Sequence, residues 1–201
     1  MIIGIDFDNT IINYDEVFYQ FALKSNLINS STPKQKVYIK NKIIKNFSEK
    51  KWTQLQGKVY SKGIFMASIF DDCLNTMHKL DKIGHKIIII SHKTKYPVLG
   101  DKFNLHINTK FWIKKNILEK KNFKNFSIND VHFNQTQNQK IKKILDKNCD
   151  IFIDDLEKVL FKLPENIFKI IFVKRYTFKK NINIIHIGNW KTIFSTINAI
   201  S

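Results

Sequence analysis

Short apolar runs, most of them followed by polar residues, recur along the chain and predict the strands of a buried sheet. The first, Ile2–Ile5, is nearly all apolar, as in strands that are covered on both faces. Runs of the same kind lie at Ile87–Ile90, Val131–Phe133, Ile151–Ile153, Phe168–Val173 and Ile184–Ile187. Helical segments separate these runs, so the pattern predicts an α/β fold in which parallel strands form a doubly wound sheet with right-handed crossovers.

The helices between these strands are expected from their caps and their apolar spacing. One begins at Asp71–Asp72 and ends at Gly84, and another covers Thr136–Lys147. The others are expected around Phe111–Leu118, around Leu156–Phe161 and from Trp190 onward.

The stretch 14–70, directly after the first strand, has helical spacing and no strong strand signal. Its helices are expected to begin at Asp15–Glu16, at Thr32 with Pro33 as the first helical residue, and at Ser48. Trp52 and Tyr60 are better explained as the core of this block than as a substrate platform. We therefore expect an α/β core of 1–13 and 71–201 and a small all-helical domain of 14–70.

Composition changes this picture little. The 201 residues suffice for one medium domain, or for a core with an inserted subdomain. The net charge of +17 raises nucleic acid or an anionic membrane as a partner. Nearly all of this charge is lysine, with Arg175 the sole arginine, whereas nucleic-acid readers normally use arginine. Nucleic acid is therefore a possible partner that is not favoured, because an AT-rich coding sequence gives the same bias.

The two cysteines, Cys73 and Cys149, are too few for a disulfide framework or a zinc site made of cysteines. Asp6 and Asp8 stand where a signal peptide needs apolar residues, and no apolar run approaches the length of a membrane span. We expect a cytoplasmic protein with no membrane partner.

Polar side chains follow three of the predicted strands. Asp6 and Asp8 follow the first, Ser91 follows the strand Ile87–Ile90, and the pair Asp154–Asp155 follows Ile151–Ile153. Because the carboxyl ends of parallel strands meet at one edge of the sheet, these groups are expected to converge on one cleft.

A lysine is expected to join them from the helix Thr136–Lys147. A helix that follows a strand runs back from the same edge, so its first turn lies near the cleft. The apolar stripe of this helix is expected to consist of Ile141, Ile144 and Leu145. Lys140 flanks this stripe at the start of the helix, whereas Lys143 points nearly away and lies one turn further on. Lys140 is the cation that we expect in the cleft, with Lys142 or Lys143 as the alternative.

The carboxylates suit a magnesium-dependent reaction at phosphorus. Mg²⁺ would be held by Asp6 and Asp154, by the backbone carbonyl of Asp8 and by waters. Asp6 would be the nucleophile that forms an aspartyl phosphate, and Asp8 would protonate the leaving oxygen and later deprotonate water.

The remaining polar groups would bind the phosphoryl group. Ser91 and Lys140 would hold its oxygens, and Asp155 would orient a metal-bound water. Thr10, His92 and Lys93 are the further candidates for substrate contact. For His92 a structural or surface role is the simpler explanation, and for Lys93 it is a solvated loop.

The motifs DFDNT at Asp6–Thr10, the strand ending at Ser91, Lys140 and IFIDD at Ile151–Asp155 together resemble the four motifs of the haloacid dehalogenase-like (HAD) superfamily, in their usual order. The helical insert resembles the C1 cap of that superfamily. This resemblance implies a Rossmann-like, three-layer core, Mg²⁺ as the cofactor and phosphatase activity on a small phosphomonoester such as a sugar phosphate or nucleotide.

Three other functions fit less well. A phosphatase for polynucleotide ends would account for the basic charge, and a catalytically idle HAD-like domain would act as a binding module. A response-regulator receiver also combines paired carboxylates, Mg²⁺ and a lysine. Its phosphoacceptor should end the third strand, and here the carboxylates end the first strand and a later one.

Overall fold

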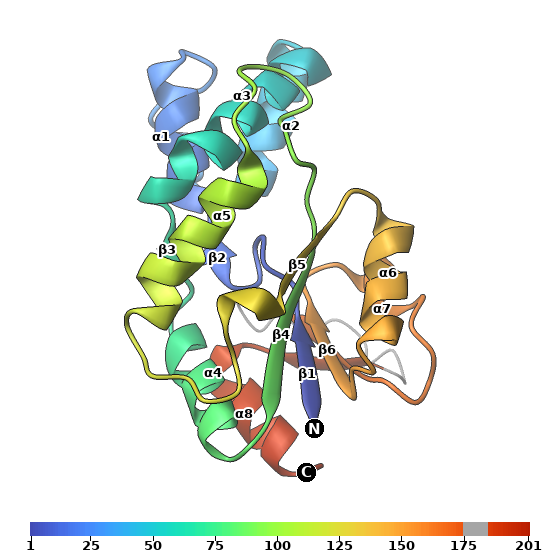
Figure 1. Ribbon diagram of the computed structural model, residues 1–201. Coiled ribbons are helices and arrows are strands. Elements are labelled where there is room, and N and C mark those ends of the chain that lie inside the picture. The colour runs from blue at the N-terminus through green and yellow to red at the C-terminus, as the bar shows by residue number, and fades with distance from the viewer. Residues whose placement is uncertain (175–184) are drawn as a thin grey trace. The chain divides into compact units, whose positions relative to one another are not determined.

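The computed structural model describes residues 1–174 and 185–201, so Arg175 and Ile184 lie outside it. Its main feature is a parallel sheet in the order β5-β4-β1-β6-β7-β8 (Figure 1). The strands are β1 (Ile2–Ile5), β4 (Lys86–His92), β5 (Val131–Asn134), β6 (Ile151–Asp154), β7 (Phe168–Phe172) and β8 (Ile185–Gly188). The α/β fold with a parallel sheet is therefore confirmed.

The strand order places β1 at the centre. After β1 the chain builds β4 and β5 on one side, and then crosses back to build β6, β7 and β8 on the other. The order thus reverses between β1 and β6, which are neighbours. In open α/β sheets the crevice beyond the strand ends at such a point is where ligands bind.

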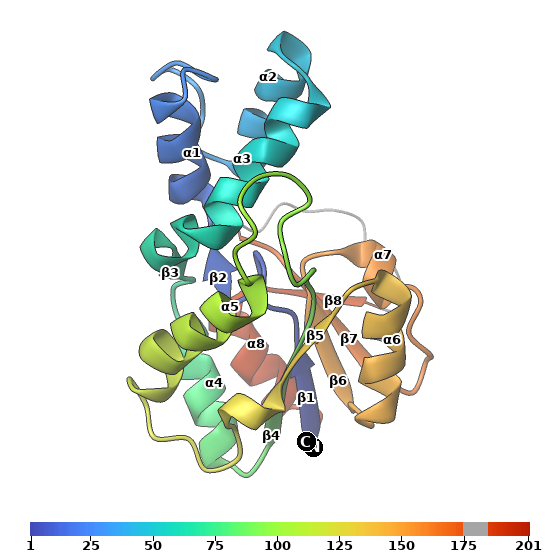
Figure 2. The ribbon, with the colours of Figure 1, turned by 45° about the horizontal axis from the view of Figure 1, so that its top comes forward.

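Helices cover both faces of the sheet, which gives the three layers predicted (Figure 2). On one face α6 (Gln137–Asp146) and α7 (Glu157–Leu160) share a core with β4 and β6 through Ile144, Leu160, Ile90 and Phe152. On the other face α4 (Cys73–Lys82) and α8 (Trp190–Asn198) are joined by a hydrogen bond of 2.8 Å from the Thr76 hydroxyl to the Trp190 carbonyl.

Contacts divide the chain into two units. Unit 1, the sheet and its helices, comprises Met1–Ile12, Ile69–Lys93 and Ile113–Ser201, and unit 2 comprises Asn13–Ser68 and Thr94–Trp112. The two-residue strands β2 (Ile12–Asn13) and β3 (Ser68–Ile69) pair where the chain passes between the units. The sequence pattern did not assign Thr94–Trp112 to the helical block, and a cap of 14–70 stays a prediction.

Unit 2 is helical and has an aromatic core. Its helices are α1 (Asp15–Lys24), α2 (Lys36–Asn46), α3 (Glu49–Ser61) and α5 (Leu105–Ile113). Phe18 stacks on Trp52 with ring centroids 5.0 Å apart, and Tyr60 meets Phe18 edge to face at 5.7 Å. Trp52 is therefore a buried core residue, as expected, and the half-buried Tyr60 packs against this core.

Several local predictions were wrong. The second helix begins at Lys36 instead of Pro33, because the Thr32 hydroxyl donates to the Asn29 side chain in the preceding turn and caps no helix. Leu145 was expected in the apolar stripe of α6 but is 42% exposed, since the buried face of this helix runs through Lys140 and Ile144. By contrast, the helix expected around Phe111–Leu118 is confirmed: it consists of the end of α5 and a π-helical turn at Lys114–Leu118.

Both cysteines, Cys73 and Cys149, are free thiols and are buried. Among the described residues, no helix has the length and apolar character needed to cross a membrane.

Candidate active site

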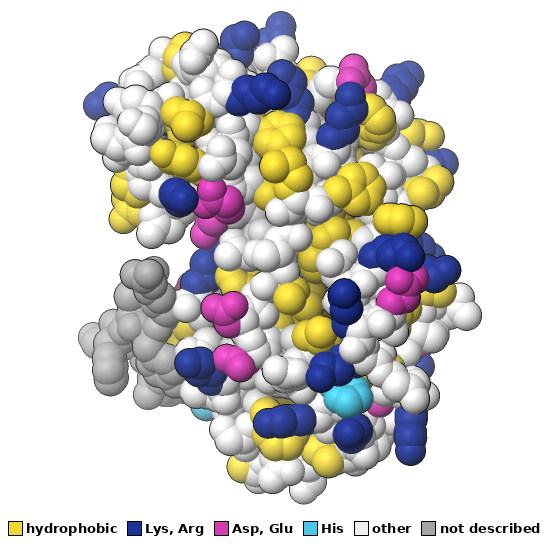
Figure 3. All heavy atoms as spheres, turned by 90° about the vertical axis from the view of Figure 1, so that its left-hand side faces the viewer, with side chains coloured by type: hydrophobic (Ala, Val, Ile, Leu, Met, Phe, Trp, Pro, Cys, Tyr) yellow, Lys and Arg dark blue, Asp and Glu magenta, His cyan; other side chains and the backbone are white. Residues whose placement is uncertain are grey.

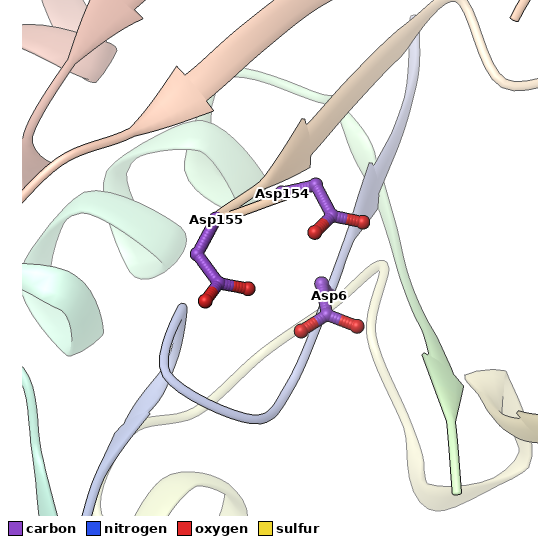
Figure 4. Close-up of side chains that lie close together, drawn as sticks. All are labelled: Asp6, Asp154 and Asp155. Carbon is purple, nitrogen blue, oxygen red and sulfur yellow. The ribbon is translucent and has the colours of Figure 1, made fainter. Parts of the chain in front are cut away.

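Three carboxylates gather at the edge where the strand order reverses. Asp6 directly follows β1, and its backbone N–H donates to the Ile153 carbonyl of β6 at 2.9 Å, which carries the pairing of the two strands one residue further. Asp154 ends β6 and Asp155 follows it. Oxygens of the three carboxylates lie within 4.8 Å of one another, as Figure 4 shows.

A tight turn follows Asp6 and determines where Asp8 leaves the chain. The Ile11 and Ile12 N–H groups both donate to the Phe7 carbonyl, at 3.0 and 3.1 Å. Asn9 has a φ of 63°, a left-handed conformation that asparagine tolerates well. The Trp190 indole N–H donates to the Thr10 carbonyl at 2.8 Å, so α8 holds the far side of this turn.

Lys140 reaches the carboxylates from the first turn of α6. Thr136 and Gln139 form a capping box that begins this helix. The Lys140 ammonium donates to Asp6 Oδ1 at 2.5 Å and to Asp154 Oδ2 at 2.6 Å, and the side chain is 2% exposed. Lys142 and Lys143 form no ion pair with a described residue, so of these three lysines Lys140 is the one that reaches the carboxylates.

The ionisation of Asp6 is governed by burial. Burial raises the pKa of the Asp6 carboxyl well above its usual range, Lys140 opposes this shift, and the neighbouring carboxylates add to it. Burial also lowers the pKa of Lys140, but attraction to Asp6 and Asp154 outweighs it and the net shift is upward. Carboxylates therefore outnumber ammonium groups among the described residues of this cluster, which favours the binding of a further cation.

Two buried hydroxyls, one near the end of β4 and one in the turn after β1, have no hydrogen-bond partner within the described chain. Ser91 lies near the end of β4 and is 1% exposed, and its hydroxyl has no hydrogen-bond partner within the described chain. Thr10 has no exposed surface, and its hydroxyl also lacks such a partner. Buried polar groups in native proteins are nearly always paired, and those left unpaired often await a water, ion or ligand. These two hydroxyls are therefore placed to bind a polar ligand.

Asp8 has a partner that the sequence did not indicate. The Lys93 ammonium lies 3.0 Å from Asp8 Oδ1 and 2.8 Å from Oδ2. Lys93 is 4% exposed, so the expectation of a solvated loop at this position was wrong. His92 is exposed, and its Nε2 lies 3.0 Å from the Gln135 carbonyl oxygen.

The residues present fit a hard divalent cation. Carboxylate oxygens are the ligands that Mg²⁺ prefers, and Asp6, Asp154 and Asp155 offer them close together. Asp154 Oδ1 also accepts the Leu156 N–H at 2.9 Å, which fixes the orientation of that carboxylate. Asp155, expected to act through water, is also close enough to bind a cation directly.

One further residue at this edge was missed. Asn134 ends β5, is 7% exposed, and donates from its side-chain nitrogen to the Ser91 carbonyl at 3.3 Å. It supports the backbone that carries Ser91. The rule that located Asp6, Ser91 and Asp154, a polar residue at the carboxyl end of a strand, applies equally to Asn134.

The fold has relatives among solved structures. No protein-family model and no curated protein matches the chain. A Had-superfamily hydrolase from Ehrlichia chaffeensis is 14% identical with a TM-score of 0.54, over 98% of this chain and 96% of that one. A haloacid dehalogenase-like family hydrolase from Xanthomonas campestris is 10% identical with a TM-score of 0.54, over 100% and 95%.

A third structure, described as a "putative phosphatase" from Clostridium difficile, is 17% identical with a TM-score of 0.58, over 98% of this chain and 97% of that one. At identities this low, the structural similarity shows a shared fold alone, and the activity has to be inferred from the site. The four motifs in the sequence and the arrangement of the strands thus lead to the same result: the protein has the fold of the HAD-superfamily hydrolases.

Proposed function

We propose that this protein is a Mg²⁺-dependent phosphohydrolase that cleaves a small phosphomonoester. The observation that carries this proposal is the contact of the Lys140 ammonium with both Asp6 and Asp154, beside the unpaired Ser91 hydroxyl. A carboxylate, a cation and a hydroxyl donor placed together are the groups that phosphoryl transfer needs.

In the proposed reaction Asp6 attacks phosphorus through a carboxylate oxygen, and the bond from phosphorus to the leaving oxygen breaks. Asp8 gives its proton to that oxygen, which departs as an alcohol. Asp8 then takes a proton from water, whose oxygen attacks the aspartyl phosphate and releases inorganic phosphate and free Asp6.

The other groups bind and neutralise charge. Lys140 and Ser91 hold the phosphoryl oxygens, and Thr10 is placed to donate a further hydrogen bond. Mg²⁺, held by Asp6, Asp154 and the Asp8 carbonyl, would supply positive charge to the phosphoryl group and to the carboxylates. Asp155 completes the acidic cluster, where it orients water.

A small phosphorylated metabolite is the proposed substrate, and unit 2 is the proposed cap. The chain leaves unit 1 after Ile12 and again after Lys93, and both exits follow strands whose carboxyl ends carry the site. On the face that Figure 3 shows, lysines are scattered instead of forming one stripe, which favours a metabolite over a polynucleotide end.

The test is a hydrolysis assay with para-nitrophenyl phosphate and a panel of phosphorylated metabolites, with Mg²⁺ and with chelator. We expect turnover that requires the metal and that is absent in Asp6→Asn, since an amide cannot serve as the nucleophile. Turnover that survives complete metal removal, or an active Asp6→Asn variant, would contradict the mechanism. Oligonucleotides with 3′-phosphates, assayed at two salt concentrations, test the polynucleotide alternative.

A further inference from the structure

The proposed acid and base, Asp8, has its own buried cation. The Lys93 ammonium contacts both oxygens of the Asp8 carboxylate, at 2.8 and 3.0 Å, although the two residues are 85 positions apart. The Lys93 side chain is 3% exposed and that of Asp8 is 19% exposed. Because one ammonium approaches both oxygens, it restricts the position and rotation of the carboxylate together.

Lys93 is itself held firmly. Its backbone N–H donates to the Asn134 carbonyl at 2.8 Å, which extends the pairing of β4 and β5 by one residue. Its ammonium also lies 5.7 Å from the centroid of the Phe7 ring, and Phe7 has no exposed surface. A lysine loses much rotamer freedom and its hydration on burial, so the ion pair with Asp8 has to offset both.

Among the described residues, the buried ammonium groups of Lys140 and Lys93 form ion pairs with different carboxylates. Lys140 donates to Asp6 and Asp154, and Lys93 pairs with Asp8. Lys93 also follows Ser91 by two residues, on the segment that leads out of unit 1. A direct substrate contact by Lys93, expected from the sequence, is the alternative to positioning, since an ammonium has three N–H donors.

We propose that Lys93 is a positioning residue for Asp8: its ammonium fixes the Asp8 carboxylate in the orientation used for proton transfer, and it acts on the reaction through Asp8 instead of binding the substrate. This inference rests on the proposed phosphohydrolase function. It assigns Lys93 a different role from Lys140, which contacts the nucleophile.

A double-mutant cycle tests this assignment. The variants are Lys93→Met, which keeps the length of the side chain, Asp8→Asn, and the two combined. Para-nitrophenyl phosphate is the substrate for the cycle, because its leaving group departs without a proton and the Asp8→Asn variants can still form the aspartyl phosphate. Their kcat then reports how fast this intermediate is hydrolysed without the base. Glycerol 2-phosphate, an alkyl phosphomonoester whose leaving group needs a proton, is measured beside it for the Lys93 variants.

We expect Lys93→Met to lower kcat for glycerol 2-phosphate by about 10–100-fold with little change in KM, the usual effect of losing a group that orients a reacting one. In the Asp8→Asn background, Lys93→Met should change kcat for para-nitrophenyl phosphate by less than about twofold, since its target is gone. Lys93→Arg, which keeps the charge, should retain more activity than Lys93→Met. Lys95→Met, in the exposed part of the same loop, should resemble the wild type.

A higher KM in Lys93→Met at unchanged kcat, or an equal loss in the presence and absence of the Asp8 carboxylate, would mean that Lys93 binds substrate and would overturn the proposal. Circular dichroism of each variant separates loss of fold from loss of rate. The combined variant leaves neither charge unpaired, so it can be compared with Asp8→Asn even if Lys93→Met alone unfolds. A wild type that hydrolyses no phosphomonoester would reject the proposed function itself, and this inference with it.

Discussion

Replacing Lys140 by methionine removes the ammonium that lies between Asp6 and Asp154 while keeping the length of the side chain. Both contacts are short, 2.5 and 2.6 Å, and the exposed fractions of the Asp6 and Asp154 side chains are 6% and 0%. Removing one partner of a buried ion pair typically costs about 3–5 kcal/mol, because the remaining charge is left uncompensated. The raised pKa of Asp6 lets this carboxyl take up a proton in the variant, so we expect the lower end, about 3 kcal/mol.

The assay is urea denaturation followed by circular dichroism, with chelator and with Mg²⁺. In chelator, Lys140→Met should unfold at a clearly lower urea concentration than the wild type. Mg²⁺ should recover part of the difference, because a divalent cation that binds the folded carboxylates stabilises the folded state. The rate should fall as well, by about 10²–10³-fold in kcat, the usual loss of one donor to a developing charge.

Lys143→Met is the matched control. Lys143 is on the same helix and forms no ion pair with a described residue, so its replacement should change the free energy of unfolding by less than about 0.5 kcal/mol. Our reasoning would be refuted if Lys140→Met were as stable as the wild type in chelator. A larger loss in Lys143→Met would show that the register of α6 is misplaced.

Three further predictions follow from single residues. Because the folded state raises the pKa of Asp6, ionisation of this group lowers stability as pH rises above the usual aspartate value of about 3.9. Without metal, Asp6→Asn should therefore have a higher melting temperature than the wild type at pH 7, and this difference should vanish in acid. A difference in melting temperature that is independent of pH would contradict the shift. Ser91→Ala should lower kcat by about 10²–10³-fold and leave the melting temperature nearly unchanged, since this hydroxyl has no partner within the described chain; unaltered kinetics would remove Ser91 from the site. Gly4→Ala would bring a Cβ to 2.6 Å from Phe152 Cδ2 and should cost about 1–3 kcal/mol in urea denaturation, and a neutral effect would mean that the ring moves aside.

Much of the site could be predicted because its parts are local patterns. Asp6 and Asp154 each follow an apolar run, and parallel pairing brings the ends of such runs together. Lys140 was located by the direction of the helix that carries it. The burial of the Lys140 side chain was not predicted, because the expected apolar stripe included Leu145. In the structure Lys140 and Ile144 are the buried residues of this helix.

The pairing of Lys93 with Asp8 could not be read from the sequence. The residues are far apart in the chain, and the contact depends on which rotamer a long side chain adopts after β4 and β1 have paired. For the same reason no local pattern indicates that Thr94–Trp112 joins the helical unit, since that association depends on tertiary contacts.

The separation of the site residues along the chain also bears on protein synthesis. Asp6 precedes its partner Lys140 by 134 residues, and Lys140 precedes Asp154 by another 14. One edge of strand β1 stays unpaired until β6 has been synthesised. While the ribosome is still making the segments between them, the Asp6 carboxylate has neither its ammonium nor its acidic neighbour. The reactive cluster is thus assembled late, when most of the chain has already emerged.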